Sequence, residues 1–407
     1  MTPGPCKTLI LGVAMLALAA AFAVPVRAQD APAKASFEVY GFAMLDFGKQ
    51  IDRINPDWYD VMRPTKLPAF DGEYGTDGNV FMSVRQSRFG VQSWLPTSAG
   101  DLYTIFEFDM FGVGPDAGQT TIRLRKAWGQ LGKFGAGQNN SSFMDIGVFP
   151  NTLEYWGPNG MVFFRNIQLR YSPIQGESFL NIALEQPGAS ADRGEYADRI
   201  ELDGVAAKFP VPDLTAQYRS AHEWGYIQIG GILRYIEWED MNAGVTDFSG
   251  DATGWGVTLS SNIKAGKHDV LRLQGVYGEA IQNYMNDAPV DIGIQNNFSD
   301  PVSPIIGVAL PMWSMVAFLD HTWSEKWTSS IGYSTLVIDN SDGQAADAFK
   351  SGAYAAVNLI YYPAPNVLAG LEYTWGQRKN FDDGWTFDDN RIALSVKYSF
   401  SKKIGGM

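Results

Sequence analysis

Apolar and polar residues alternate along most of this chain in segments of roughly ten residues. In residues 104–110, Phe106 and Phe108 fall on one side of the segment, and Glu107 and Asp109 fall on the other. Residues 390–400 repeat the pattern near the C-terminus. A period of two predicts β-strands whose two faces meet different surroundings, such as lipid and water.

Sixteen such segments can be read from the sequence. They cover residues 36–48, 80–95, 101–111, 120–131, 133–138, 163–173, 178–186, 214–221, 226–238, 253–263, 268–280, 312–323, 327–338, 352–362, 367–378 and 390–400. Short connectors alternate with long loops between them. A soluble β-sandwich also alternates, but this order of connectors favours an all-β fold, a transmembrane antiparallel up-and-down β-barrel with short periplasmic turns and long extracellular loops.

Two further stretches test this interpretation. Residues 199–209 also alternate, and we place them in a loop hairpin because single-chain bacterial barrels have an even number of strands. Residues 302–319 are apolar and uncharged, which suggests a helix, but Pro304 and Pro311 interrupt them. We expect a loop packed on or into the barrel mouth, followed by a strand.

The N-terminus predicts export. Lys7 precedes an apolar run at 9–24, which closes on Val26-Arg27-Ala28. This order is typical of a cleaved signal peptide at residues 1–28, and the run is short for a membrane anchor. Residues 29–35 would then form a short periplasmic segment, residues 36–400 the barrel and residues 401–407 a C-terminal tail.

Composition agrees with one large all-β unit better than with several soluble domains. The chain has 43 Gly, 12 Trp, 18 Tyr and 24 Phe, and few long amphipathic helical patterns. Loss of residues 1–28 removes Lys7 and Arg27 but no acid, so the net charge falls from −13 to about −15. Nucleic acid is therefore not an expected partner. Cys6, the sole cysteine, precedes the apolar run, so no disulfide is expected.

Several blocks carry a resemblance to a known family. Residues 40–48 (YGFAMLDFG), 55–68 (NPDWYDVMRPTKLP), 85–92 (RQSRFGVQ) and 123–145 (RLRKAWGQLGKFGAGQNNSSFMD) resemble the DcaP-like outer-membrane porins. The resemblance implies a trimeric sixteen-stranded channel in the bacterial outer membrane that takes up dicarboxylates and related small anions. Some members have an N-terminal coiled-coil extension, which this chain lacks room for. Phosphate-selective porins share a similar layout.

Pore chemistry should come from charges that face the water-filled interior, because arginine facing lipid near the midplane costs about 2–4 kcal/mol. Strand parity gives a set of candidate pore-lining residues: Arg85, Arg88, Arg123, Arg125, Arg170, Arg219 and Arg272. Arg123 and Arg125 share one face, whereas Arg85 and Arg88 have opposite parity unless a bulge intervenes. Cationic rings are how anion pores select. Each arginine could instead be a wall residue paired with a lumen acid such as Glu107 or Asp109.

The third long loop, residues 139–162, is the expected constriction. It follows a very short strand, so a loop folded inward would cover the remaining length. Its candidate residues are Phe143, Asp145, Glu154, Tyr155 and Trp156. A loop that covers only the mouth is the alternative. The acids of the outer loops could bind divalent cations that bridge lipopolysaccharide, or could simply be solvated.

An enzyme is the competing class of function. His222, His268 and His321 are scattered near predicted turns, and no Gly-x-Ser-x-Gly elbow, metal-ligand pair or phosphate-binding loop occurs in a matching context. We expect no catalytic residue, metal or cofactor. The sequence therefore predicts an outer-membrane porin for passive, anion-preferring diffusion of small solutes such as dicarboxylates. A phosphate or general-solute porin and a non-conducting structural or adhesin barrel remain the alternatives.

Overall fold

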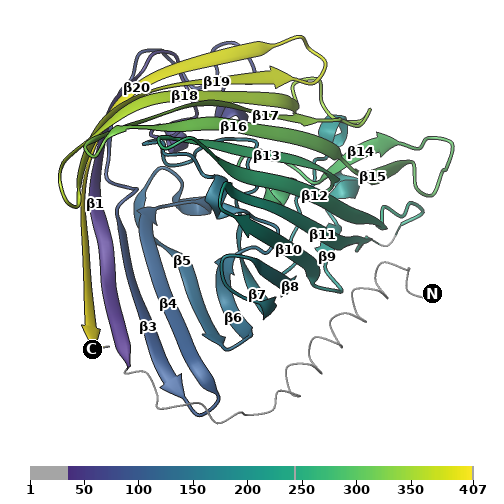
Figure 1. Ribbon diagram of the computed structural model, residues 1–407. Coiled ribbons are helices and arrows are strands. Elements are labelled where there is room, and N and C mark those ends of the chain that lie inside the picture. Colours follow the sequence, from purple (N-terminus) through teal and green to yellow (C-terminus); the bar gives the residue numbers. More distant parts are fainter. Residues whose placement is uncertain (1–34, 243, 406–407) are drawn as a thin grey trace.

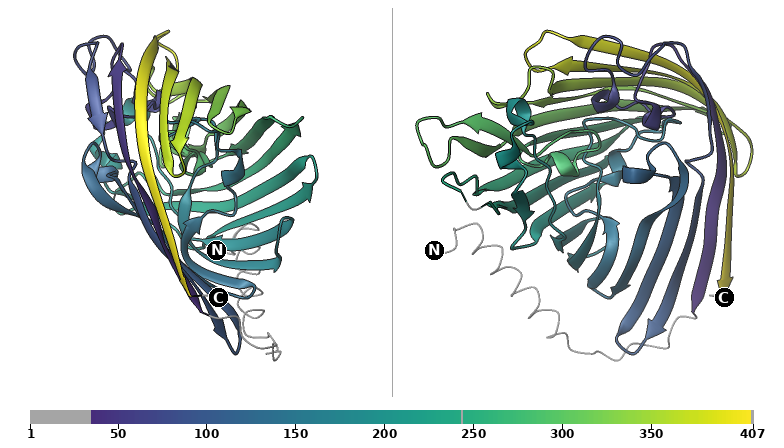
Figure 2. Two further views of the ribbon diagram at one scale, coloured as in Figure 1. Left: turned by 60° about the vertical axis from the view of Figure 1, so that its left-hand side comes forward. Right: turned by 180° about the vertical axis from the view of Figure 1, so that it is seen from behind.

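The computed structural model describes residues 35–242 and 244–405, so the predicted signal peptide lies outside the described residues. The described chain forms a closed antiparallel β-barrel of sixteen strands. The last strand, β20, pairs with β1 from Ser36↔Gly405 to Gln50↔Arg391. Figures 1 and 2 show these two strands side by side where the ring closes. The fold predicted from the alternation is confirmed.

The bounds of the elements follow the predicted segments closely. The strands are β1 (Ser36–Gln50), β2 (Val80–Ser83), β3 (Arg88–Thr97), β4 (Gly100–Phe111), β5 (Thr120–Leu131), β6 (Phe134–Asn140), β7 (Arg165–Ile174), β8 (Phe179–Glu185), β9 (Val205–Lys208), β10 (Asp213–His222), β11 (Gly225–Asp240), β12 (Gly250–Ala265), β13 (Asp269–Glu279), β14 (Ile292–Asn296), β15 (Ile305–Ala309), β16 (Pro311–Ser324), β17 (Trp327–Ile338), β18 (Phe349–Ala364), β19 (Val367–Asn380) and β20 (Thr386–Gly405). Strands β2 and β3 together form one interrupted wall strand, and β9, β14 and β15 lie outside the count of sixteen.

Short 3-10 turns occur only between strands in the described part of the chain. They are η1 (Pro56–Trp58), η2 (Pro64–Lys66), η3 (Gly114–Asp116), η4 (Ile146–Val148), η5 (Gly194–Tyr196), η6 (Ile200–Leu202) and η7 (Gln282–Tyr284). None of the described helices has the length and apolar character needed to cross a membrane.

The two faces of the wall differ as the alternation predicts. On β20, Leu394 is 47 % exposed on the outside, whereas its neighbour Ser395 is 1 % exposed on the inside. On β4, Phe106 is 53 % exposed, and Asp109 is buried. The outside is thus an apolar surface suited to lipid, and the polar groups line the interior.

Three loops fold over or into the barrel. We call residues 51–79 the first loop and residues 280–310 the sixth loop. The third loop, expected at residues 139–162, lies between β6 and β7 at residues 141–164. Trp58 and Met62 of the first loop and Met161 of the third loop pack in one buried apolar cluster with Phe111 of β4. Phe143 of the third loop packs in another with Tyr284 of the sixth loop. Apolar contacts of this kind hold the loops against the wall.

Residues 199–209 do not form a separate loop hairpin as we expected. Strand β9 pairs with the C-terminal part of β11, from Glu237↔Lys208 to Asp240↔Val205. Strand β10 pairs with the N-terminal part of β11, from Leu214↔Leu233 to His222↔Gly225. Pro210 and Pro212 stand between β9 and β10 and lack the N–H that a continuous ladder needs. The segment therefore extends a wall strand and leaves the even count unchanged.

Residues 302–319 contain strands in both halves, and the helical alternative is wrong. Strand β16 begins at Pro311, as expected for the second half. The first half contains β15, which pairs with β14 in a two-stranded hairpin. This hairpin projects beyond the wall at the right of Figure 1. We expected an irregular loop there, because proline and the short apolar run hide its strand period.

The closing strand is also longer than its sequence pattern indicates. Residues Ser401–Gly405 continue β20 and pair with Ser36–Tyr40 of β1. They are therefore part of the wall rather than a tail beyond it, a correction to the predicted boundary at residue 400. The stretch 401–405 is short and polar, and so carries no clear apolar face.

Candidate functional site

The third loop crosses the lumen and is fastened on the far wall by Asp145. The Asp145 carboxylate accepts hydrogen bonds from Arg219 Nη2 of β10 at 2.6 Å, Tyr226 Oη of β11 at 2.9 Å and Ser260 Oγ of β12 at 2.6 Å. Arg272 of β13 reaches the same segment through the Gly147 carbonyl at 2.5 Å. These contacts place the loop inside the barrel.

The return half of the loop is fastened to β19 and to the first loop. The backbone N–H groups of Leu153 and Glu154 donate to the Glu372 carboxylate at 2.8 and 2.7 Å. The Glu154 carboxyl accepts from Met62 N at 3.0 Å and from Gly157 N. Burial raises the pKa of Glu154 to about 8, and the neighbouring Glu372 adds to that shift. Burial thus favours the neutral form of Glu154, and its two hydrogen bonds make it a structural acid that joins the third loop to the first.

Tyr155 connects the loop to an arginine network on β4 and β5. Arg123 holds Asp109 with two hydrogen bonds, at 3.0 and 2.7 Å. Arg125 bridges Asp109 and Glu107, each at 2.8 Å. The Tyr155 hydroxyl contacts Asp109 and both arginines. Tyr155 thus ties the third loop to the inner wall at β4 and β5.

A cavity of about 540 Å³ opens beside this network. It lies where the first, third and sixth loops meet β5 and β7. Its charged residues are Arg63, Arg123 and Arg165, and its aromatic residues are Trp58, Tyr155, Trp156, Phe163 and Phe164. Amide side chains of Gln138, Gln282, Asn283 and Asn286 complete the polar lining. Among the described residues that line it, none is an aspartate or a glutamate.

The three arginines of this cavity differ in their counter-charges. Arg63 pairs with Asp287 at 2.8 Å, and Arg123 pairs with Asp109 at 2.7 Å. Arg165 stacks on Phe163 with its guanidinium carbon 5.2 Å from the ring centre. Within the described residues, no acid lies within ion-pair distance of Arg165, and its Nη1 atom is buried without a hydrogen-bond partner. The cavity therefore carries an excess of positive charge.

Of the seven arginines predicted from strand parity, only Arg123 lines this cavity. Arg125 does not line the cavity, but it shares the Asp109 carboxylate with Arg123. Arg219 pairs with Asp145 and so holds the third loop. Arg272 of β13 pairs with Asp320 of β16 and so joins two neighbouring wall strands. Arg170 donates to the Asn140 carbonyl at 2.5 Å and holds the end of β6. Most of the predicted ladder is therefore engaged with protein atoms.

Arg85 needs a correction, whereas Arg88 faces the interior. The wall strand breaks between Ser83 and Arg88, where one more residue is used than on β1, so the bulge that the parity argument left open does intervene. Arg85 has no exposed surface, pairs with Asp60 at 2.7 Å and lies over Phe111. It is a structural anchor of the first loop and does not line the pore. Arg88 lies over Phe42 on the inner wall.

Sequence reasoning missed Arg63, Arg165 and the sixth loop. Arg63 and the sixth-loop residues lie where no strand period exists to assign a face. Arg165 begins β7, directly after the third loop, at a boundary that period-two reading cannot fix. The block at residues 55–68 contained Arg63, but its neighbours give no sign that the first loop turns inward.

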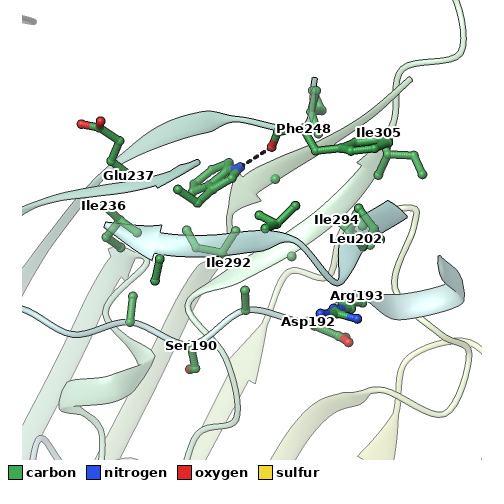
Figure 3. A pocket seen from close by; sticks show the side chains of 18 residues that line it. Ser190, Asp192, Arg193, Leu202, Ile236, Glu237, Phe248, Ile292, Ile294 and Ile305 are labelled. Carbon is green, nitrogen blue, oxygen red and sulfur yellow. Dashed lines mark hydrogen bonds between the residues drawn. The ribbon is translucent and has the colours of Figure 1, made fainter. Parts of the chain in front are cut away.

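A second cavity, of about 260 Å³, lies under the projecting hairpin (Figure 3). Its lining is mainly apolar, with Ile236, Ile292, Ile294, Ile305 and Phe248 around it. Trp238 closes one side by donating from Nε1 to the Phe248 carbonyl at 2.9 Å. Its only charged lining residues in the described chain are Asp192, Arg193 and Glu237. This cavity lacks the cationic character of the first.

A closed barrel with an apolar outer face, a polar lumen and loops folded inward defines the class of outer-membrane channels. The chain matches the model of the family described as DcaP outer membrane protein over residues 63–400, which is most of its length. The protein therefore belongs to the DcaP outer-membrane protein family and is a channel of the bacterial outer membrane.

Solved structures show the same fold. The outer-membrane channel DcaP of Acinetobacter baumannii has a TM-score of 0.74 at 21 % identity, over 93 % of this chain and 100 % of that chain. The trimer form of OmpT from Vibrio cholerae has a TM-score of 0.53 at 12 % identity, over 90 % and 99 %. The anion-selective porin from Comamonas acidovorans has a TM-score of 0.55 at 8 % identity, over 90 % of this chain and 100 % of that chain. No curated protein matches the chain.

Proposed function

We propose that this channel gives passive, anion-preferring diffusion of small solutes, with carboxylates and dicarboxylates as the favoured class. The observation that carries the proposal is the cavity at the junction of the three inward loops, whose lining contains Arg63, Arg123 and Arg165 and no carboxylate among the described residues. Fixed cations in a low-dielectric passage raise the local potential by several kT, which attracts anions and repels cations.

Arg165 contributes most of the uncompensated charge. Arg63 and Arg123 each have a carboxylate partner behind the cavity wall, whereas Arg165 has no described acid within ion-pair distance. Arg165 is partly buried and its buried Nη1 atom has no hydrogen-bond partner, a cost that an incoming anion would relieve. Arg165 is thus the residue that gains most from a passing carboxylate.

The lining also fits carboxylate chemistry. Guanidinium groups bind a carboxylate through two parallel hydrogen bonds. Arg123 comes from β5 and Arg165 from β7, so two cations approach the cavity from separate strands. Amide donors such as Gln138 and Asn283 can contact further oxygens. A solute with two carboxylates can therefore be passed between neighbouring donors, and weak binding at each allows its release.

We also propose that three copies assemble in the membrane. Support comes from the trimer form of the Vibrio cholerae relative and from the family resemblance. Contacts would be made by the apolar outer wall, which also meets lipid and lipopolysaccharide. Cross-linking of the purified protein in detergent, followed by mass measurement, would distinguish a trimer from a monomer.

Replacement of one arginine tests the function. Arg165→Gln should lower the anion-to-cation permeability ratio in planar bilayers at low salt by about two-fold or more, because it removes the unpaired cation of the cavity. Arg170→Gln is the matched control, since Arg170 lies on the same strand, has no acid within ion-pair distance among the described residues and does not line the cavity. Arg170→Gln should lower the permeability ratio less than Arg165→Gln does.

Solute competition refines the substrate class. A four-carbon dicarboxylate should slow chloride current through the wild type more than phosphate does, and Arg165→Gln should weaken that block. Equal block by phosphate would favour a phosphate or general anion channel. An unchanged permeability ratio in Arg165→Gln would contradict the proposal.

A further inference from the structure

Asp287 of the sixth loop stands directly behind the cavity. It lies between Asn286 and Ala288, which both line the cavity, but its own side chain has no exposed surface. Its carboxylate accepts from Arg63 Nε at 2.8 Å, from Thr65 N at 2.9 Å and from Thr65 Oγ1 at 2.5 Å. All of these donors belong to the first loop. One buried carboxylate thus fixes the segment that carries Arg63.

Arg63 is held between two indole rings as well. Its guanidinium carbon lies 4.0 Å from the ring centre of Trp58 and 4.3 Å from that of Trp156. Trp156 is fixed in turn by Asn286, which accepts from Trp156 Nε1 at 2.8 Å and donates to the Trp156 carbonyl at 2.5 Å. Two consecutive residues of the sixth loop therefore position the first loop and the third loop at the cavity.

We propose that Asp287 is a positioning and charge-setting residue for solute selection: it orients Arg63 at the edge of the cavity and reduces the positive charge that a solute meets there. The inference rests on the proposed anion preference and adds the residue that sets its strength. The guanidinium stays in place through its two indole contacts, while the carboxylate behind it offsets part of its field.

This role predicts the opposite sign from a purely structural role. If Asp287 only held the loops together, its replacement would loosen the opening, raise the conductance and lower the anion preference. If Asp287 sets the charge, Asp287→Asn leaves an amide oxygen for Thr65 and removes the negative charge beside Arg63. The indole rings then keep Arg63 near the cavity, and the anion preference rises.

Reversal potentials in planar bilayers, with the full-length protein at low salt, test the inference. Asp287→Asn should raise the anion-to-cation permeability ratio by about two-fold or more, and 1 M salt should reduce that gain because the Debye length falls to about 3 Å. Asp291→Asn is the matched control. Asp291 belongs to the same loop and is equally buried, but it pairs with Arg234, which does not line the cavity. A ratio in Asp287→Asn that is unchanged or lower than in the wild type would overturn the proposal.

A second variant applies if Asp287→Asn gives no folded barrel. Asp287→Glu keeps the charge but displaces it by one methylene group, so the permeability ratio should stay near the wild-type value while the residence time of a blocking dicarboxylate falls at least about two-fold. An unchanged residence time would contradict the positioning role. A wild-type protein without anion preference would refute the proposed function. It would leave the present proposal open, because that proposal concerns only the difference in permeability ratio between Asp287→Asn and the wild type.

Discussion

Arg125 illustrates how charge and structure are linked inside this barrel. Its side chain is 8 % exposed and bridges Glu107 and Asp109, so it gives little charge to a solute. An extra residue in the pairing of β4 with β5 separates Glu107↔Lys126 from Phe108↔Leu124. Arg125 is the extra residue, and it faces the interior beside Arg123, as strand parity had indicated, while the bulge turns Lys126 inward as well, opposite Glu107.

Arg125→Ala should therefore cost stability more than selectivity. It leaves Glu107 without its hydrogen-bonded arginine in a buried site, a loss of about 3 kcal/mol in the free energy of unfolding. Thermal unfolding of the purified barrel, followed by its change in gel migration, measures this. The double variant Arg125→Ala with Glu107→Gln should recover part of the loss. Wild-type stability in Arg125→Ala would contradict the network described for Tyr155.

Glu154 gives a pH dependence with a definite sign. Its pKa is raised from 4.5 to about 8 by burial and by Glu372, so the folded protein binds a proton that the unfolded chain releases. Its contribution to stability is full below about pH 4.5 and is lost as the pH rises through about 8. The melting temperature should fall across this range, and Glu154→Gln should flatten the fall. An identical pH profile in the variant would exclude Glu154 as the cause.

Among the elements, β20 shows where a strand's role differs from its sequence pattern. Ser401–Gly405 pair with the first residues of β1, and an unpaired strand edge cannot remain in lipid. Deletion of residues 401–407 should therefore lower the yield of folded barrel in the outer membrane. Substitution of Lys402 and Lys403 by Ser, which keeps the backbone pairing, is the control. Normal yield after the deletion would show that this part of the ladder is dispensable.

The wall could be predicted from sequence because lipid and water impose a period of two on every strand. Residues 390–400 and 104–110 needed no further information. The loops have no such period, so the inward fold of the first loop and the position of Asp287 were not predictable. Strand β15 was hidden by flanking prolines. The inward course of the third loop was predicted only from the shortness of β6.

At the scale of the whole molecule, the barrel provides a rigid ring in which three loops meet. The third loop spans the lumen from Asp145 at β10–β12 to Glu372 on β19. The first loop and the sixth loop close around it through Arg63 and Asp287. Contacts to the wall and between the loops therefore surround the cationic cavity.

The reversal potential of the wild-type protein under a potassium chloride gradient tests the account most directly. At about 0.1 M salt, where the Debye length is about 10 Å, the account predicts that chloride permeates better than potassium, and that the preference declines toward 1 M. A reversal potential of zero, or one that shows potassium to be the more permeant ion at low salt, would contradict it.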